Sequence, residues 1–281
     1  MLTMLDLDAF VARVWQQGVL FGRNDLPWRQ TDDAYAILVS EVMLQQTQVA
    51  RVLTHWKSFL ALFPTLDALA ASDTATVLEA WQGLGYNRRA LALKHTAEIC
   101  SARHEGALPQ TLEGLLALPG IGQATAAGVL SFAYNEPSVY IETNVRTVFI
   151  HDLFPDQTAV SDKMLYPLVE ATCSADNPRG WYYALLDYGA HLKQIVVNPS
   201  RKSAHYARQS TFIGSRRQKR AEALRQVLAC PGIDDAQLFQ ALNEAERHAG
   251  RDTINEETYQ SIVGDLVKEG FFQNENGFYR A

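Results

Sequence analysis

The sequence predicts an all-helical main body followed by a small C-terminal module of three helices and one β-hairpin. Three observations favour this fold class. Apolar residues recur at helical spacing through most of the chain, and no convincing strand precedes residue 271. The motif LPGIG at Leu118–Gly122 separates two apolar helical runs, as in a tight hairpin between helices. Near the end, Asn276 and Gly277 stand between aromatic pairs, which is the signal of a β-hairpin.

Length and composition agree with two domains. The chain has 281 residues, of which 47% are hydrophobic, so two ordinary cores can be filled. The clearest linker is Phe212–Arg216, and we place the domains at residues 1–213 and 214–281. Residues 1–21 form an amphipathic pattern that charges such as that of Asp6 interrupt, unlike a signal peptide or a membrane-spanning run. We therefore expect a soluble protein without membrane contact, located in the cytoplasm with the nucleoid.

The first candidate for chemistry is Glu41. Its carboxylate lies within the apolar helical pattern of Ser40–Val49, shortly after Leu26–Arg29. A carboxylate on an apolar helix face loses hydration, so its pKa rises toward neutrality, which suits a general acid at pH 7. The alternative is a structural glutamate, buried in an ion pair with an arginine such as Arg29.

The hairpin at Leu118–Gly122 is a candidate phosphate site. Gly120 and Gly122 permit backbone conformations that are closed to other residues, and a helix begins at Gln123 with free amide groups. Those amides and the helix dipole bind phosphate without help from a basic side chain. The alternative is a plain corner between two helices, where the glycines serve only the turn.

A second carboxylate, that of Glu142, follows this hairpin and precedes a helix that we expect to start near Asn144. Acidic and hydroxyl side chains cap helix N-termini whatever the function, so Glu142 and Thr143 can be explained as a cap alone. The motifs around this residue give it a second interpretation.

Five motifs occur in the order LPWR at Leu26–Arg29, SEVMLQQT at Ser40–Thr47, GLGYN at Gly83–Asn87, LPGIG at Leu118–Gly122 and NVR at Asn144–Arg146. This order, with an acidic residue before NVR, resembles the helix-hairpin-helix DNA glycosylases, specifically the adenine-specific mismatch glycosylases. The resemblance runs from about Leu26 to Ala190, and SEVMLQQT is its most specific motif. It implies a bilobal all-α fold with the active cleft between the lobes, in which the first and last helices form one lobe.

The resemblance also implies roles for single residues. Glu41 would protonate a base that has been flipped out of the duplex, and Glu142 would stand near the sugar. Gln46 would fill the gap left in the base stack, with Tyr86 beside the opposing base. The base pocket would include Trp28, Arg29, Asn144 and Asp187.

Glu142 is the first departure from the family. Relatives have an aspartate there, which stabilises the oxocarbenium-like sugar or adds to it. The extra methylene changes the reach of the carboxylate, and a misplacement of about 1 Å can cost roughly 10²-fold in rate. Either the backbone compensates or the chemistry differs, unless the residue is only a cap.

The cysteines are the second departure. Relatives usually hold a 4Fe–4S cluster with four cysteines, because the cluster needs thiolate ligands. This chain has only Cys100, Cys173 and Cys230, without a CxxC pair, so it cannot build that cluster. We expect no cofactor and no catalytic metal, with a structural cation at the hairpin as an option. Three scattered thiols suit packing roles in a reducing cytosol.

Where the cluster loop would lie, the sequence is basic. Residues 193–220 hold eight bases and no acid. The bases are Lys193, Arg201, Lys202, Arg208, Arg216, Arg217, Lys219 and Arg220. We expect this stretch to contact the phosphates of the DNA backbone, first through Arg201, Lys202 and Arg208. A solvated basic linker is the alternative.

The C-terminal module is the third departure, because relatives in this branch commonly carry a domain there that reads 8-oxoguanine. Helical periodicity here covers Arg217–Ala229, Asp234–Leu242 and Asn255–Glu269, and a hairpin covers residues 271–280. Thr253 and Glu256 are spaced as a capping box. The module is therefore predicted to be winged-helix-like. Residues 234–281 hold ten acids against four bases, which opposes contact with phosphates and favours packing or a protein partner.

Ala124 bears on the type of reaction. Relatives that also cleave the DNA backbone carry a lysine at this position, and Ala124 offers no amine for a Schiff base. It also leaves room around the base. We therefore predict a monofunctional DNA N-glycosylase of base excision repair, acting on double-stranded DNA that contains a lesion or mismatch, with adenine in a mismatch as the leading substrate. The alternatives are the same reaction on a deaminated or alkylated purine or a mismatched thymine or uracil, and a lesion-binding or recruiting protein without catalysis.

Overall fold

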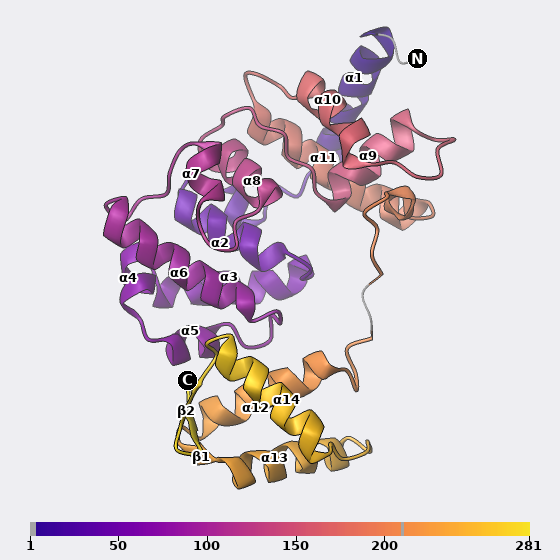
Figure 1. Ribbon diagram of the computed structural model, residues 1–281. Coiled ribbons are helices and arrows are strands. Elements are labelled where there is room, and N and C mark those ends of the chain that lie inside the picture. Colours follow the sequence, from indigo (N-terminus) through magenta and orange to yellow (C-terminus); the bar gives the residue numbers. More distant parts are fainter. Residues whose placement is uncertain (1–3, 209–210) are drawn as a thin grey trace. The chain divides into compact units, whose positions relative to one another are not determined.

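The computed structural model describes residues 4–208 and 211–281 (Figure 1). These residues are mostly helical, and their named strands are short and confined to residues 233–280. The prediction of an all-helical body is confirmed. The helices before residue 104 are α1 (Met4–Phe21), η1 (Pro27–Arg29), α2 (Ala34–Leu44), α3 (Val49–Leu62), α4 (Leu66–Ala71), α5 (Thr74–Ala80) and α6 (Arg88–Arg103). Those from residue 112 to residue 202 are α7 (Leu112–Leu116), α8 (Gln123–Ala133), α9 (Thr143–Leu153), α10 (Asp162–Thr172), α11 (Pro178–Ile195) and η2 (Pro199–Lys202).

The described residues form two compact units. The first lies within residues 1–70 and 95–207, and the second within residues 71–94 and 208–281. The segment of residues 71–94 therefore packs with the C-terminal helices. The domain boundary expected after residue 213 stays a prediction. None of the helices in the described part of the chain is long and apolar enough to cross a membrane.

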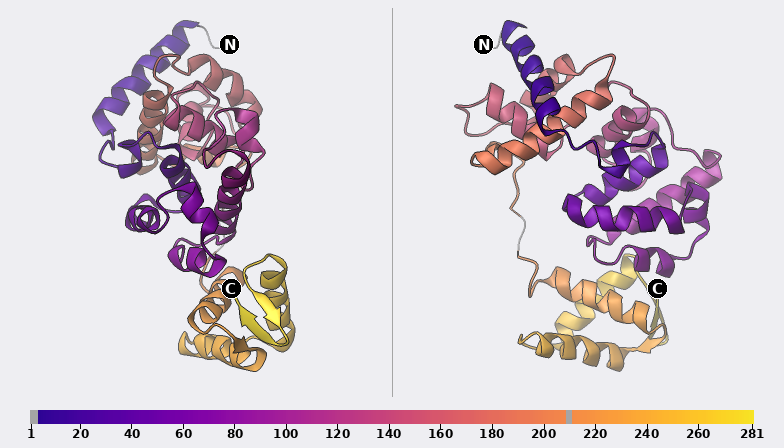
Figure 2. Two further views of the ribbon diagram at one scale, coloured as in Figure 1. Left: turned by 90° about the vertical axis from the view of Figure 1, so that its left-hand side faces the viewer. Right: turned by 180° about the vertical axis from the view of Figure 1, so that it is seen from behind.

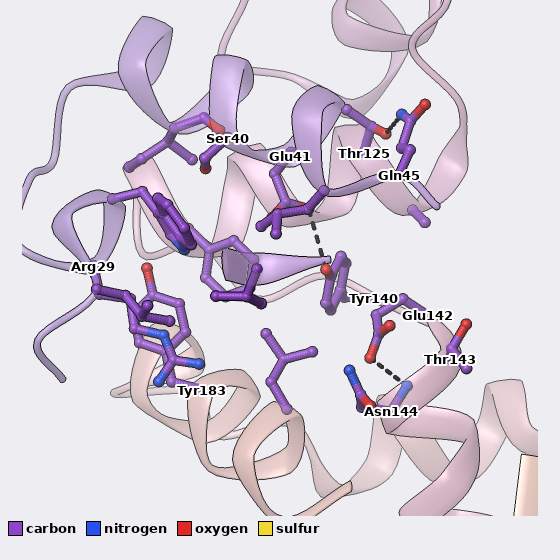
Figure 3. Close-up of a pocket in the computed structure, with 18 of the residues that line it drawn as sticks. Arg29, Ser40, Glu41, Gln45, Thr125, Tyr140, Glu142, Thr143, Asn144 and Tyr183 are labelled. Carbon is purple, nitrogen blue, oxygen red and sulfur yellow. Dashed lines mark hydrogen bonds between the residues drawn. The ribbon is translucent and has the colours of Figure 1, made fainter. Parts of the chain in front are cut away.

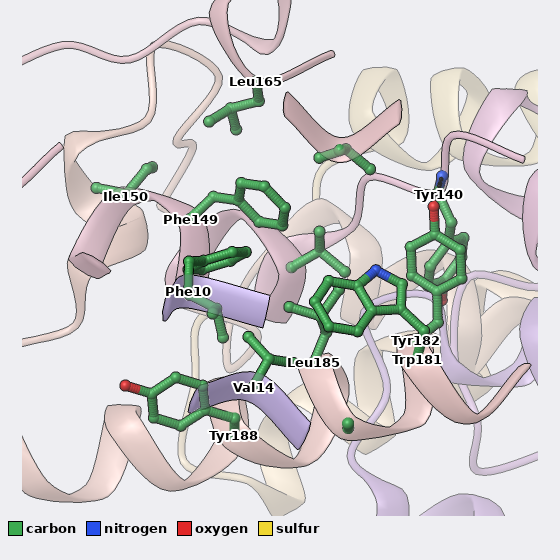
Figure 4. Packing of buried hydrophobic residues seen from close by; sticks show 14 of the residues in the cluster. Phe10, Val14, Tyr140, Phe149, Ile150, Leu165, Trp181, Tyr182, Leu185 and Tyr188 are labelled. Carbon is green, nitrogen blue, oxygen red and sulfur yellow. Dashed lines mark hydrogen bonds between the residues drawn. The ribbon is translucent and has the colours of Figure 1, made fainter. Parts of the chain in front are cut away.

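One part of the first unit is a bundle of α1, α9, α10 and α11 (Figure 1). Its core contains Phe10 of α1, Phe149 of α9 and Trp181 of α11, all at most 2% exposed (Figure 4). A Cβ atom on Gly18 would lie 2.5 Å from that of Ala184, so the glycine allows α1 and α11 to approach closely. The first and late helices of the body thus pack together, as the resemblance implies.

The other part of the first unit is built around α2 and α8, which pack against each other. The side chain of Asp33 caps α2 by accepting hydrogen bonds from the amides of Tyr35 and Ala36 at 2.8 and 3.0 Å. Nearly every residue of α2 is buried, because the helix crosses the middle of this part and meets neighbours on all sides. Only a functional or paired charge is tolerated in such a helix, and Glu41 is its one charged residue.

The hairpin between α7 and α8 corrects one expectation about its glycines. Gly120 has φ 72°, a left-handed conformation that favours glycine. Gly122 instead has φ −90° and ψ 176°, which any residue adopts, and a Cβ atom there would meet nothing within 4 Å. The turn therefore requires glycine at position 120 but gives no reason for glycine at position 122.

The C-terminal part of the second unit contains three helices and a three-stranded sheet (Figure 2). They are α12 (Arg216–Ala229), β1 (Ile233–Asp234), α13 (Asp235–His248), α14 (Glu256–Lys268), β2 (Gln273–Glu275) and β3 (Phe278–Arg280). The antiparallel sheet has the order β1-β3-β2, and Ile233 pairs with Tyr279. Asn276 and Gly277 both have positive φ, as a two-residue hairpin turn requires. The description as winged-helix-like stays a prediction.

Two local expectations about these elements were wrong. The capping box is formed by Asp234 and Gln237 at the start of α13, whereas Asn255 caps α14 by accepting from the amide of Thr258 at 2.9 Å. Thr253 therefore lies outside α14. Strand β1 was missed because two residues are too few to show a sequence alternation.

Candidate active site

A cavity of about 280 Å³ lies in the first unit and is lined by residues from several regions of the chain (Figure 3). Trp28 and Arg29 come from η1, Glu41 from α2, and Glu142 from the segment before α9. The start of α8 and two residues of α11 complete the wall. The two carboxylates that the sequence singles out thus face the same enclosed space.

Glu41 is held from two sides. The Tyr140 hydroxyl donates a hydrogen bond to Glu41 Oε2 at 3.1 Å (Figure 3). On α8, a Cβ atom at Gly128 would lie 2.5 Å from the same oxygen, so the missing side chain makes room for the carboxyl group. No ion pair joins Glu41 to Arg29 among the described residues, because Arg29 pairs with Asp187 instead.

The environment of Glu41 favours its protonated form. Burial raises the pKa of Glu41 to about 8, the Tyr140 hydrogen bond opposes this rise, and the charge of Glu142 adds to it. The charge of Arg29 also lowers the pKa of Glu41. At pH 7 most molecules therefore carry a proton on Glu41.

Glu142 is both a helix cap and a cavity residue. Its Oε1 accepts hydrogen bonds from the amides of Asn144 and Val145 at 2.5 and 3.0 Å, at the start of α9. No described residue donates a hydrogen bond to its Oε2. Burial raises the pKa of Glu142, while Lys193, the two amides and Arg146 all favour the ionised form. The two explanations of Glu142, as a cap and as a functional carboxylate, are therefore compatible.

Arg29 is positioned by Asp187. The guanidinium donates two hydrogen bonds to the Asp187 carboxylate at 2.6 and 2.9 Å, and Arg23 adds another at 2.6 Å. Burial alone would raise the pKa of Asp187, but Arg29 and Arg23 outweigh it and hold that pKa below its usual value. Arg29 lines the cavity, whereas Asp187 lies one contact behind the wall. Asp187, predicted as a pocket residue, acts on the cavity through Arg29.

Aromatic rings form much of the remaining wall. Tyr183 of α11 stacks on Phe132 with ring centroids 4.7 Å apart, and the Arg29 guanidinium lies 4.3 Å above the Tyr183 ring. Trp28 is 5% exposed and packs edge-on against Trp56. Flat apolar walls with a few polar groups are typical of pockets that hold a small planar ligand.

The other predicted pocket residues lie at the cavity as well. Asn144 lines it and accepts a hydrogen bond from the Lys193 ammonium at 2.7 Å. Ala124 and Thr125, in the first turn of α8, form another part of the wall, where Gln45 donates to the Thr125 hydroxyl at 3.0 Å. No lysine is among the described residues that line the cavity.

Gln46 and Tyr86, the two predicted wedge residues, both have left-handed backbone conformations. Gln46 has φ 55° in the turn after α2, where it lines the cavity, and Tyr86 has φ 49° in the loop before α6. For residues other than glycine this conformation costs about 1 kcal/mol or more, and such strain collects at functional sites. Gln46 belongs to the first unit and Tyr86 to the second.

The hairpin and the basic stretch differ in whether their donor groups are already bonded within the protein. The amides of residues 123–125 donate to no group in the described chain, so the start of α8 has free donors. Among the predicted contacts of the basic stretch, Arg201 and Arg208 are exposed, whereas the Lys202 ammonium donates to the Pro155 carbonyl at 2.6 Å.

The remaining bases correct the prediction of one continuous phosphate-binding stretch. Arg216 pairs with Asp265, Lys219 with Glu246 and Arg220 with Glu269, at 2.6, 3.5 and 2.6 Å. Acids of α13 and α14 thus neutralise three of the bases of α12. Residues 214–281 hold nine bases and eleven acids, so the module is close to neutral once α12 is counted with it.

The cysteines make no disulfide in the described part of the chain, where Cys100 is buried and Cys230 exposed. Burial raises the pKa of the Cys100 thiol to about 11, so it stays protonated and unreactive. Residues 4–208 and 211–281 contain no group of three or more potential metal ligands from His, Cys, Asp and Glu. The expectation of a protein without cofactor stays a prediction.

Tyr140, Gly128 and Tyr183 are the site residues that the sequence analysis missed. One signal for Tyr140 was available. In extended backbone, residues two positions apart point to the same side, so Tyr140 shares its side with Glu142. Gly128 and Tyr183 carry no such signal, because their contacts with the cavity depend on how α8 and α11 pack.

Comparison with known proteins identifies relatives of this region. Residues 39–171 match the HhH-GPD superfamily of base excision DNA repair proteins. An adenine DNA glycosylase of Buchnera aphidicola subsp. Baizongia pistaciae is 34% identical over 171 residues, which cover 60% of this chain and 49% of that protein. The adenine DNA glycosylase of Mycolicibacterium smegmatis is 46% identical over 127 residues, or 45% and 43% of the two chains. The chain thus spans about half the length, or less, of these relatives.

Solved structures share the fold. The structure of a thermostable thymine-DNA glycosylase superposes with a TM-score of 0.58 at 24% identity, covering 66% of this chain and 86% of that one. A non-covalent endonuclease III–DNA complex gives a TM-score of 0.53 at 18% identity, covering 89% and 100%. At these identities the likeness concerns the fold alone.

Proposed function

Because the chain carries a domain of the HhH-GPD superfamily, we propose that it is a monofunctional DNA N-glycosylase that removes a base flipped out of double-stranded DNA. The leading substrate is adenine in a mismatch, as in the relatives of similar sequence. One observation carries the proposal: a carboxyl group that is protonated at pH 7 and a second carboxylate line one cavity with aromatic walls. Because the proposed substrate is DNA, we expect the protein to be located at the nucleoid.

Glu41 is the general acid. Its pKa of about 8 leaves it protonated at neutral pH yet able to release the proton to a ring nitrogen of the departing base. The Tyr140 hydrogen bond occupies Oε2 and leaves the other oxygen for the base. Protonation of the base weakens the bond to the sugar because the leaving group departs neutral.

Glu142 stabilises the positive charge that develops on the sugar. Lys193 and two backbone amides favour its ionised form, and its Oε2 is not engaged by the cap. A fixed carboxylate near a developing cation stabilises the transition state without moving. Two carboxyl groups, one acting as the acid and the other lying beside the sugar, are a recurrent solution for cleaving glycosidic bonds.

Hydrolysis without backbone cleavage is the proposed outcome. The residues that line the described cavity include Ala124 but no lysine, and the Lys193 amine is bonded to Asn144. With no amine presented to the sugar, water is the nucleophile and an abasic site is the product. The small Ala124 side chain favours the second candidate, the same reaction on a modified purine or another mismatched base, because it widens the cavity.

The DNA backbone would be held by groups outside the cavity. The free amides at the start of α8 suit a phosphate, and the absence of a side chain at Gly122, which the turn does not require, lets a phosphate approach them. Arg201 and Arg208 would add salt-dependent affinity. Gln46 and Tyr86 are the proposed wedge residues. A cation at the hairpin stays an option. A protein partner for the C-terminal module loses support, since Glu246, Asp265 and Glu269 are paired internally.

The test is single-turnover release of free base from duplexes that place adenine opposite each of the four bases and opposite 8-oxoguanine, together with deaminated and alkylated purines, thymine and uracil. Glu41→Gln should abolish release and leave DNA binding nearly unchanged. Release by Glu41→Gln at the wild-type rate would refute the assignment. Binding without release on every duplex would favour the lesion-binding alternative.

Glu142 is tested by a pair of substitutions. Glu142→Asn keeps a side chain that can cap α9 but loses the charge, so this variant should fold normally and lose release. Glu142→Asp keeps the charge and should retain or raise activity. If Glu142→Asn releases base as fast as wild type, Glu142 is only a cap.

A further inference from the structure

The second unit presents an exposed aromatic ring on a rigid loop. Tyr86 is 37% exposed and lies in the loop between α5 and α6, next to Gly85 with φ 74°. The Trp81 indole and the Arg89 guanidinium both donate to the Gly85 carbonyl, at 3.2 and 2.9 Å. These two hydrogen bonds hold the backbone of the loop, while the Tyr86 side chain is partly exposed.

The C-terminal module contacts this ring directly. Arg217, on the first turn of α12, donates a hydrogen bond to the Tyr86 hydroxyl at 2.7 Å. The Arg217 guanidinium also lies 5.6 Å from the centroid of the Tyr86 ring and 5.9 Å from that of Phe212, a ring that is 51% exposed. An arginine is thus placed between two exposed aromatic side chains.

Ion pairs fix α12 relative to the loop. The Glu269 carboxylate accepts from Arg88, two residues after Tyr86, at 2.7 Å and from Arg220 of α12 at 2.6 Å. The loop that carries Tyr86 and the helix that carries Arg217 are therefore both bonded to the Glu269 carboxylate at the end of α14. The shared anchor reduces the freedom of Arg217 to leave the ring.

We propose that Arg217 positions Tyr86 for stacking on an unpaired base, so that the C-terminal module takes part in reading the base left opposite the extruded one. Aromatic rings beside guanidinium groups are the surfaces on which unpaired bases stack. This role rests on the proposed function, because extrusion of one base is what leaves its partner unpaired. The module acts through one arginine, and its acidic helix α14 does not need to approach phosphates.

The experiment measures stacking without base release. Full-length protein is titrated with a duplex in which a stable abasic-site analogue faces 2-aminopurine, a base whose fluorescence falls when it is stacked. Wild type should quench the fluorescence, Tyr86→Leu should not, and Arg217→Ala should quench less. Across duplexes with different opposing bases, Arg217→Ala should reduce the ratio of the strongest to the weakest affinity by about tenfold, the size of one hydrogen bond to a charged group.

A double-substitution cycle separates positioning from general loss of contact. Tyr86→Phe removes only the hydroxyl that Arg217 bonds, so it should match Arg217→Ala, and the double variant should lose nothing more. Arg225→Ala is the matched control, because Arg225 lies on the same helix and pairs with Glu222. Thermal unfolding checks that each variant is folded, and if Arg217→Ala is not, Tyr86→Phe alone decides.

The proposal would be overturned if folded Arg217→Ala quenched the fluorescence and discriminated between opposing bases as wild type does. Additive losses in the double variant would also overturn it. Because the abasic analogue needs no excision, failure of the stacking proposal can be distinguished from failure of the proposed function. Quenching without base release on any duplex would refute the glycosylase but keep the stacking surface. Base release without quenching by wild type would support the glycosylase and refute the stacking surface.

Discussion

Replacing Tyr140 with phenylalanine tests the chemistry of Glu41 most directly. The Tyr140 hydroxyl bonds Glu41 Oε2 at 3.1 Å and lowers the pKa of Glu41, because a donor stabilises the ionised carboxylate. Burial holds the pKa of Tyr140 itself well above its usual value, so the hydroxyl remains a donor throughout the accessible pH range. Removing it should raise the pKa of Glu41.

The magnitude follows from the two protonation states. With a pKa of about 8, wild-type Glu41 is protonated in about ten molecules for each ionised one at pH 7, and release should fall about tenfold per pH unit above pH 8. A hydrogen bond to a charged group contributes about 1.5 kcal/mol, which corresponds to about one pH unit. The alkaline limb of the Tyr140→Phe profile should therefore move to higher pH by about that amount.

The assay is single-turnover base release from pH 6 to pH 10 with protein in excess. Tyr183→Phe is the control, because Tyr183 lines the same cavity but donates no hydrogen bond to Glu41 in the described structure. Its alkaline limb should keep the wild-type midpoint. A Tyr140→Phe limb that stays in place or moves to lower pH would refute the assignment of Glu41 as the acid or of Tyr140 as its donor.

Three further predictions concern stability and binding. Glu41→Gln should stabilise the fold by on the order of 5 kcal/mol more at pH 9 than at pH 4, because the raised pKa of about 8 makes the folded state lose stability as pH rises from about 4.5 to 8. Equal effects in urea unfolding at both pH values would contradict this. Asp187→Asn should lower the free energy of unfolding by about 3 kcal/mol, since it leaves the buried Arg29 without its carboxylate, and an unchanged urea midpoint would argue against the ion pair. Reversing the charges of Arg201 and Lys202 should reduce the slope of log affinity against log salt by about one to two. Most of the change should come from Arg201, because Lys202 is bonded to the Pro155 carbonyl. An unaltered slope would indicate that the stretch is only a solvated linker.

The sequence predicts best those features that depend on neighbouring residues. Glu41 is recognisable because a single carboxylate interrupts an apolar helical run, and the structure has it lining the cavity. The Asn276 turn is recognisable because its left-handed backbone selects few residue types. In both cases the signal and the structure lie within one helix or one turn.

Features that depend on tertiary packing escape such reasoning. Tyr140 meets Glu41 across 99 positions in the chain, and its spacing from Glu142 places it on the side of the cavity without predicting this contact. Gly128 is an ordinary helical glycine until the neighbouring carboxyl group is known to lie where its Cβ would be. The acidic charge of residues 234–281 misleads for a related reason, because the bases that pair with Asp265 and Glu269 lie on α12, outside that range.

The two oxygens of Glu142 have different tasks. Capping requires one oxygen beside the amides of Asn144 and Val145, and an aspartate can meet the same requirement, as the prediction for Glu142→Asp assumes. The longer glutamate can keep Oε1 at the cap while Oε2 has no donor among the described residues. Because the cap fixes the carboxylate to the helix backbone, it also supplies the fixed geometry that stabilisation of a developing charge needs. Cap and charge stabilisation are thus two uses of one carboxylate, which explains why removing its charge should abolish release without unfolding the helix.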